Sequence, residues 1–114
     1  MEVTHKLKDG CSIYYFKKKI DIFNSERIKK YLVESIEKEN IKKIIFNFKD
    51  LSDIDSIGIA VLIKIIGKSN EKISVRFCEV GERVTKALSY TQINSFFVFN
   101  RTEKESIEEL NKES

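Results

Sequence analysis

The residues with the clearest capacity for chemistry lie in one stretch, Leu51 to Leu62, which reads Leu-Ser-Asp-Ile-Asp-Ser-Ile-Gly-Ile-Ala-Val-Leu. It follows an apolar strand and opens a helix, so we expect Ser56 at a helix N-terminus. The backbone N–H groups there attract anions, and a phosphate on Ser56 would be well placed. It would add roughly −1.5 to −2 charges at pH 7, enough to reverse the electrostatics of a docking surface. The simpler interpretation, that Ser56 or Asp55 only caps the helix, stays open.

A helical wheel of the same segment predicts which side faces water. At about 100° per residue, one apolar side should pack on the sheet, formed by Ile59, Leu62, Ile63 and Ile66. Lys64 and Lys68 fall on the opposite side, with Ile57 and Val61 between and beside them. Such a mixture next to Ser56 predicts a protein-binding patch that includes Ile57, Val61 and Lys64. Ordinary surface hydrophobics, or cover by the C-terminal helix, are an equal alternative.

Other kinds of chemistry fit the sequence poorly. A receiver domain would need an acidic pair after its first strand, and none follows Val3 to Leu7. A cysteine phosphatase loop needs five residues between its cysteine and arginine, but only four separate Cys78 from Arg83. His5 is the only histidine, and the four glycines are scattered, so neither a metal cluster nor a phosphate-binding loop is indicated. We therefore predict no catalytic activity, no cofactor and no metal.

Strands and helices are expected to alternate along the chain. Strands are predicted at 3–7, 12–17, 41–48, 72–78 and 96–99, and helices at about 25–36, 57–69, 82–90 and from 103 onward. The Asp9-Gly10 pair predicts a hairpin between the first two strands. The pattern predicts one α/β domain over residues 1–114, with a mixed sheet of four to five strands and about four helices packed on it.

Two helix starts carry recognisable signals. Asn24 is expected to cap the first helix, with Phe23 packing onto Ile28 as a hydrophobic staple. Thr102 and Glu105 have the spacing of a capping box at the start of the last helix.

Composition limits the cell compartment and the partners. The net charge is only +3, and the basic run Lys17 to Lys19 is interpreted as a solvated strand edge rather than a nucleic-acid patch. No apolar run approaches the ~20 residues that span a bilayer. Cys11 and Cys78 lie far apart, and no signal peptide is evident, so we expect reduced thiols in a cytoplasmic protein. We expect a monomer that binds neither nucleic acid nor membrane.

Several motifs in this order are similar to those of a known family. The segment 47–52 is similar to the end of a strand and the following loop in that family. Asp55-Ser56-Ile57-Gly58 is similar to the family's Asp-Ser-x-Gly signature, and Ile20-Asp21 is similar to the Leu-Asp motif that precedes the family's first helix. The segment 84–93, Phe97 and the Glu-rich end fit its closing pattern. Over nearly its whole length the chain resembles the STAS domain, most closely the stand-alone anti-sigma factor antagonists.

The resemblance implies a partner switch in a bacterium. The unmodified domain would bind an ATP-using anti-sigma factor serine kinase and so free a sigma factor. The kinase would phosphorylate Ser56, the phosphorylated form would let go, and a serine phosphatase would reset it. With the patch described above, the implied partner-binding residues are Asp21, Asp55, Ile57, Gly58, Val61 and Lys64.

Three positions depart from the family pattern. Ile57 stands where a second hydroxyl residue is common, and Ala60 and Gln92 stand where glycine is usual. These departures keep an alternative function open, in which the domain is never phosphorylated and acts as a scaffold or senses a small ligand such as a nucleotide or a lipid.

Overall fold

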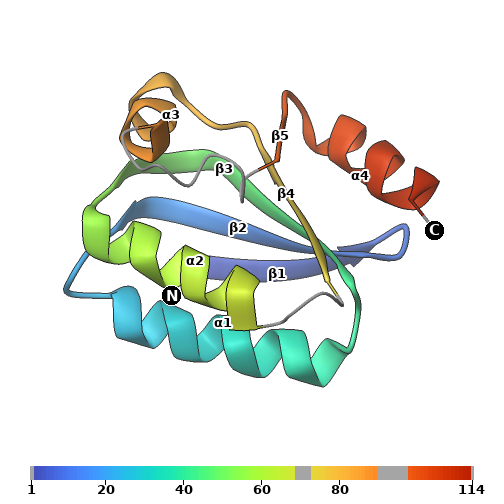
Figure 1. Ribbon diagram of the computed structural model, residues 1–114, viewed down its shortest axis with the longest axis horizontal. Helices are drawn as coiled ribbons and strands as arrows, with labels where there is room; N and C mark the ends of the chain where they lie inside the picture. Colours follow the sequence, from blue (N-terminus) through green and yellow to red (C-terminus); the bar gives the residue numbers. More distant parts are fainter. Residues whose placement is uncertain (1, 69–72, 90–97, 114) are drawn as a thin grey trace.

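Five strands and four helices alternate along the described residues, 2–68, 73–89 and 98–113, of the computed structural model (Figure 1). The strands are β1 (Val3–Lys8), β2 (Cys11–Ile20), β3 (Lys43–Ile54), β4 (Ser74–Cys78) and β5 (Phe99–Asn100). The helices are α1 (Ser25–Glu39), α2 (Ser56–Lys68), α3 (Glu82–Ser89) and α4 (Glu103–Lys112). The predicted single α/β domain is confirmed.

The strands form one mixed sheet in the order β1-β2-β3-β4-β5. β1 is antiparallel to β2, and each later neighbour pair is parallel. Asp9 and Gly10 join the first two strands with φ angles of 51° and 81°. Because a two-residue hairpin turn favours positive φ at both positions, the Asp-Gly signal predicted this turn correctly.

Some element boundaries differ from the predictions. β3 runs to Ile54 rather than ending at 48, since its polar second half pairs with the end of β2 across two register irregularities. Alternating apolar residues are absent there, which is why the sequence pattern missed it. β5 begins at Phe99. Residues 96 and 97 of the predicted strand at 96–99, and Tyr90 at the end of the predicted helix at 82–90, lie outside the described residues.

The main core is built on the sheet face that α1 and α2 cover side by side (Figure 1). Four aromatic rings contact one another at its centre, with centroids 5.1 to 5.5 Å apart, contributed by Phe16, Phe46, Phe48 and Phe77. α3 adds Val84 and Leu88 to this cluster. A smaller cluster joins α4 to the other residues of the same strands, and it consists of Cys11, Ile13, Ile45, Cys78, Ile107 and Leu110.

The exposure predicted for Val61 is wrong. Its side chain is only 5% exposed and belongs to the main core, as does Ile65 four residues later. The wheel assumed that the sheet alone covers α2, whereas α1 also packs against this helix. The buried part of the α2 surface is therefore wider than the wheel predicted and includes Val61. Ile63 and Ile66, which the wheel placed on the sheet side, are only half-buried.

The basic run lies where the interpretation from the sequence placed it, at a strand edge. The pairing of β2 with β1 ends at Phe16 opposite Val3, so Lys18 and Lys19 extend beyond β1 on that side. Their side chains are exposed. Among the helices that the structure describes, none has the length and apolar content needed to cross a membrane.

Candidate functional site

Ser56 is the first residue of α2, and its side chain is exposed. The cap is Asp55, because its Oδ1 accepts a hydrogen bond from the amide of Gly58 at 2.8 Å and its carbonyl accepts one from Ile59 at 3.0 Å. Within the part of the chain that the structure describes, the Ser56 hydroxyl has no hydrogen-bond partner. Of the two possible caps, Asp55 fills the role and leaves the Ser56 oxygen available.

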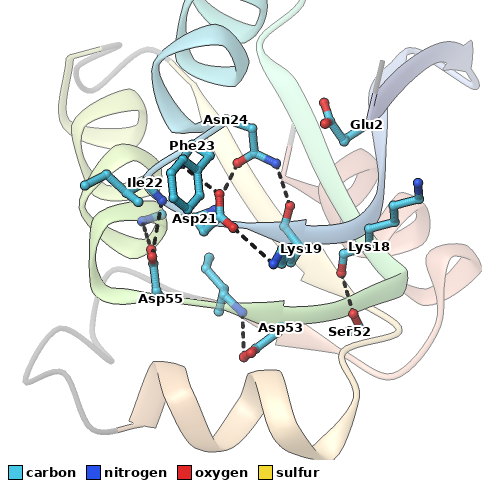
Figure 2. A network of polar contacts seen from close by, with 12 residues as sticks. Glu2, Lys18, Lys19, Asp21, Ile22, Phe23, Asn24, Ser52, Asp53 and Asp55 are labelled. Atoms are coloured by element: carbon cyan, nitrogen blue, oxygen red, sulfur yellow. Dashed lines mark hydrogen bonds and ion pairs between the residues drawn. The ribbon is translucent and has the colours of Figure 1, made fainter.

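Asp55 also fastens the loop between β2 and α1 to the start of α2. Its second carboxylate oxygen, Oδ2, accepts a hydrogen bond from the backbone amide of Ile22 at 3.2 Å, and its own amide donates to the carbonyl of Ile20 at 3.1 Å. Figure 2 shows this carboxylate between the two segments. One side chain thus joins residues that are far apart in the sequence at the edge where β2 and β3 end.

The β2–α1 loop, residues 21–24, has its own hydrogen bonds. Asp21 Oδ1 accepts from the amide of Phe23 at 2.9 Å, and Asp21 Oδ2 lies 3.5 Å from the ammonium group of Lys19. The Asn24 amide group accepts from the Asp21 backbone at 2.9 Å and donates to the Lys19 carbonyl at 2.8 Å (Figure 2). Asn24 is at the N-cap position of α1, but its side chain serves the loop instead of capping the helix, which corrects the prediction.

This loop displays two apolar side chains that the sequence reading did not assign to the site. Phe23 is 89% exposed and Ile22 is 62% exposed, so the predicted staple onto buried Ile28 does not form. Ile57, the neighbour of Ser56, is 43% exposed. We call Ile22, Phe23 and Ile57 the apolar patch. The sequence signal was Asp21, because an aspartate that bonds the backbone amide two residues on forms an Asx turn, which places residues 22 and 23 in a turn.

Gly58 allows the first turn of α2 to lie close against the C-terminal ends of β2 and β3. A Cβ at this position would lie 2.8 Å from Ile20 Cγ2, 2.9 Å from the Ile20 carbonyl oxygen and 2.9 Å from Ile54 Cγ1. The residue is buried, so its observed contribution is to packing. A contact between Gly58 and a partner stays a prediction.

The structure therefore brings together part of the predicted set. Asp21, Asp55, Ser56 and Ile57 surround the ends of β2 and β3. Lys64 is exposed as predicted, two turns further along α2. The buried Val61 leaves the set, and Ile22 and Phe23 join it.

Among the described residues, no side chain that could act as a general base is hydrogen-bonded to the Ser56 hydroxyl. The Asp55 carboxylate already accepts two backbone amides, and His5 lies on β1, where it bonds to Ser12. Burial raises the pKa of Cys78 to about 12, so this thiol stays protonated near neutral pH. The described residues contain no group of three metal-ligating side chains.

Comparison with known proteins decides the family. The STAS domain family model matches residues 2–106. The chain belongs to the STAS domain family. The family expected from the sequence is thus confirmed, and the site described above spans the Asp-Ser-x-Gly motif of this STAS domain at the end of β3 and the first turn of α2.

Three solved structures illustrate the likeness. A candidate anti-sigma factor antagonist from Thermotoga maritima is 24% identical with a TM-score of 0.87, over 96% of this chain and 94% of that one. The anti-sigma factor antagonist SpoIIAA in its unphosphorylated form is 17% identical with a TM-score of 0.78, over 96% of each chain. The Bacillus cell fate determinant SpoIIAA in its phosphorylated form is 16% identical with a TM-score of 0.68, over 95% of this chain and 98% of that one. At these identities the likeness establishes the fold of this STAS domain.

Proposed function

We propose that this STAS domain is an anti-sigma factor antagonist, which binds an anti-sigma factor serine kinase and is released when that kinase phosphorylates Ser56. The observation that carries the proposal is the exposed Ser56 hydroxyl at the first position of α2, with Asp55 as the cap behind it. The antagonists among the solved relatives, one known in phosphorylated and unphosphorylated forms, support the general role. A serine phosphatase would return the domain to its binding state in the bacterial cytoplasm.

Release follows from charge and packing. A phosphate on Ser56 adds up to two negative charges directly beside the exposed Asp55 carboxylate. In a closely packed interface that also covers the apolar patch, these charges lose water and repel each other. The bound state is thereby destabilised, while the free domain keeps both groups in solvent.

Phosphoryl transfer is the direct test. The purified domain is incubated with serine kinases of the anti-sigma factor class and ATP, and the modified residue is located by mass spectrometry. We expect one phosphate, on Ser56, and none on the Ser56→Ala variant. Ser52→Ala is the matched control, because Ser52 is also exposed but its hydroxyl donates to the Lys18 carbonyl at 2.7 Å. Phosphate on the Ser56→Ala variant would reject the proposal.

Affinity is the second test. Ser56→Glu should weaken kinase binding by about 1–3 kcal/mol, as expected for a charge placed in an interface. Ser52→Glu adds the same charge four residues earlier and should change the affinity much less. Equal losses for the two variants would show that net charge, rather than the position of Ser56, decides binding.

The alternative function, a scaffold or ligand sensor that is never phosphorylated, predicts a different result. No kinase would then modify Ser56, and nucleotides or lipids would raise the thermal unfolding midpoint. A kinase that modifies Ser56, together with no thermal shift, favours the antagonist.

A further inference from the structure

We infer that Phe23 is the anchor by which the kinase docks, and that its ring enters an apolar pocket next to the kinase's phosphoryl-transfer centre. The inference rests on the proposed function and extends it to the β2–α1 loop. It assigns a binding role to the apolar patch, Ile22, Phe23 and Ile57, which the phosphorylation site alone does not require.

The Phe23 side chain takes almost no part in the packing of the described residues. Its side chain is 89% exposed, more than any other large apolar side chain that the structure describes. The loop holds it outward, because the Phe23 amide donates to Asp21 Oδ1 and the Asn24 side chain bonds back to Lys19 (Figure 2). A fixed loop that presents an aromatic ring to water is typical of an interface anchor, since aromatic side chains dominate binding energies.

The patch is continuous with Ser56. Ile22 donates its amide to Asp55, which immediately precedes Ser56, and Ile57 immediately follows it. An enzyme that closes around the Ser56 hydroxyl must therefore cover the β2–α1 loop as well. We assign the patch to the kinase, because the kinase is the partner that the proposed function places on the unmodified Ser56 hydroxyl, as in the structure.

The rim of the patch defines the kind of pocket that fits it. The exposed Asp55 carboxylate bonds to the Ile22 amide, while the Asp21 carboxylate is only 15% exposed and lies 3.5 Å from the Lys19 ammonium group. A complementary surface would combine an apolar pocket with basic or N–H donor groups around it. The same carboxylates would oppose a phosphate on Ser56.

The test uses the kinase that phosphorylates Ser56 and compares three variants of the full chain. Phe23→Ala should raise the dissociation constant, measured by calorimetry without ATP, by roughly tenfold to a hundredfold. The kcat/KM for phosphorylation should fall in parallel, mainly through KM. Phe23→Tyr keeps the ring and should retain most of the affinity. Leu7→Ala is the matched control, because Leu7 is 52% exposed but pairs with Ser12 at the opposite end of β2.

The outcomes separate the two proposals. A kinase that binds and phosphorylates the Phe23→Ala variant like the unchanged chain overturns the anchor while leaving the antagonist function intact. An equal loss in the Leu7→Ala variant overturns it too, because general surface hydrophobicity would then explain binding. If no kinase phosphorylates the unchanged chain on Ser56, the antagonist function itself fails. Because the Phe23 and Leu7 side chains are both exposed, all three variants should unfold at the same urea concentration as the unchanged chain.

Discussion

The carboxylate of Asp55 and the backbone amide of Ile22 are hydrogen-bonded at 3.2 Å across 33 residues of sequence. The other oxygen of the same carboxylate caps α2 through the amide of Gly58. A single side chain thus fixes both the helix that begins at Ser56 and the loop that carries Phe23.

Replacing Asp55 should separate these two roles. Asp55→Ala removes both hydrogen bonds and should lower the free energy of unfolding by about 1–2 kcal/mol, the usual cost of losing a cap. Asp55→Asn keeps one side-chain oxygen for the cap but presents an NH2 group toward Ile22, so its stability cost should be smaller. Urea unfolding measures the stability, and amide hydrogen exchange at Ile22 should become faster in both variants.

Asp50→Asn is the control for these variants, because Asp50 is an exposed aspartate on β3, the strand that ends one residue before Asp55. Its replacement should leave both the unfolding midpoint and the Ile22 exchange rate unchanged. Slow exchange at Ile22 in the Asp55→Ala variant would show that the loop does not depend on this carboxylate.

Gly58→Ala should destabilise the domain by about 1–3 kcal/mol, as overpacking does. The new methyl group would lie 2.9 Å from the Ile20 carbonyl oxygen, a backbone atom that cannot move without disturbing the end of β2. Gly67→Ala is the matched control on the same helix, where nothing lies within 4 Å of an added Cβ. It should be neutral or stabilising by up to about 1 kcal/mol. Equal unfolding midpoints for the two variants would contradict the close approach of α2 to the sheet edge.

Val61 and Ile57 offer a direct comparison of the buried and exposed sides of α2. Val61→Ala should cost roughly 2 kcal/mol, because it leaves a space in the main core. Ile57→Ala should cost less than about 1 kcal/mol, since that side chain is 43% exposed. Chemical denaturation of both variants checks this order, and a larger cost at Ile57 would mean that Val61 does face solvent.

The buried thiols give a pH-dependent prediction. Burial, helped by the nearby charges of Glu103 and Glu79, raises the pKa of Cys78 to about 12, and burial also raises the pKa of Cys11. Only about one Cys78 in ten thousand is then a thiolate at pH 8. We expect the native chain to react with iodoacetamide far more slowly than the urea-unfolded chain. A Ser52→Cys variant supplies an exposed thiol as control, and equally fast alkylation of native Cys78 would contradict its burial.

The same pKa values set the sign of a stability change. The unfolded chain loses its thiol protons near pH 8.5, whereas folded Cys78 keeps its proton up to about pH 12. The unfolded state therefore binds fewer protons between these values, and the free energy of unfolding should fall as the pH rises through this window. A Cys78→Ser variant should show a weaker decrease.

Local signals predicted the parts of this fold that local chemistry decides. The Asp9-Gly10 turn has the positive φ angles it needs. Thr102 accepts a hydrogen bond from the Glu105 amide at 3.1 Å, which is one half of the predicted capping box, while the Glu105 carboxylate accepts from Asn100. The Asp-Ser-x-Gly motif placed Ser56 at the start of a helix with an exposed side chain. Each of these features depends on residues within a few positions of one another.

Contacts between distant segments explain the errors. Val61 is buried because α1 packs beside α2, which periodicity within α2 alone cannot reveal. Phe23 is an exception with a local cause. Its amide bonds to Asp21, the Asn24 side chain bonds to the Asp21 backbone, and the ring lies in solvent instead of packing on Ile28. The end of β3 was missed because its polar residues form a strand only by pairing with β2.

The Asp55–Ile22 hydrogen bond also gives the site a conformational requirement. Parallel pairing of β2 with β3 depends on contacts between remote parts of the chain, and such contacts form slowly during folding. A nascent or partly unfolded chain contains Ser56 but has not yet assembled the edge where the two loops meet. Under the function proposed above, a kinase would consequently distinguish folded domains from immature ones, and newly made chains would be phosphorylated only after their sheet is complete.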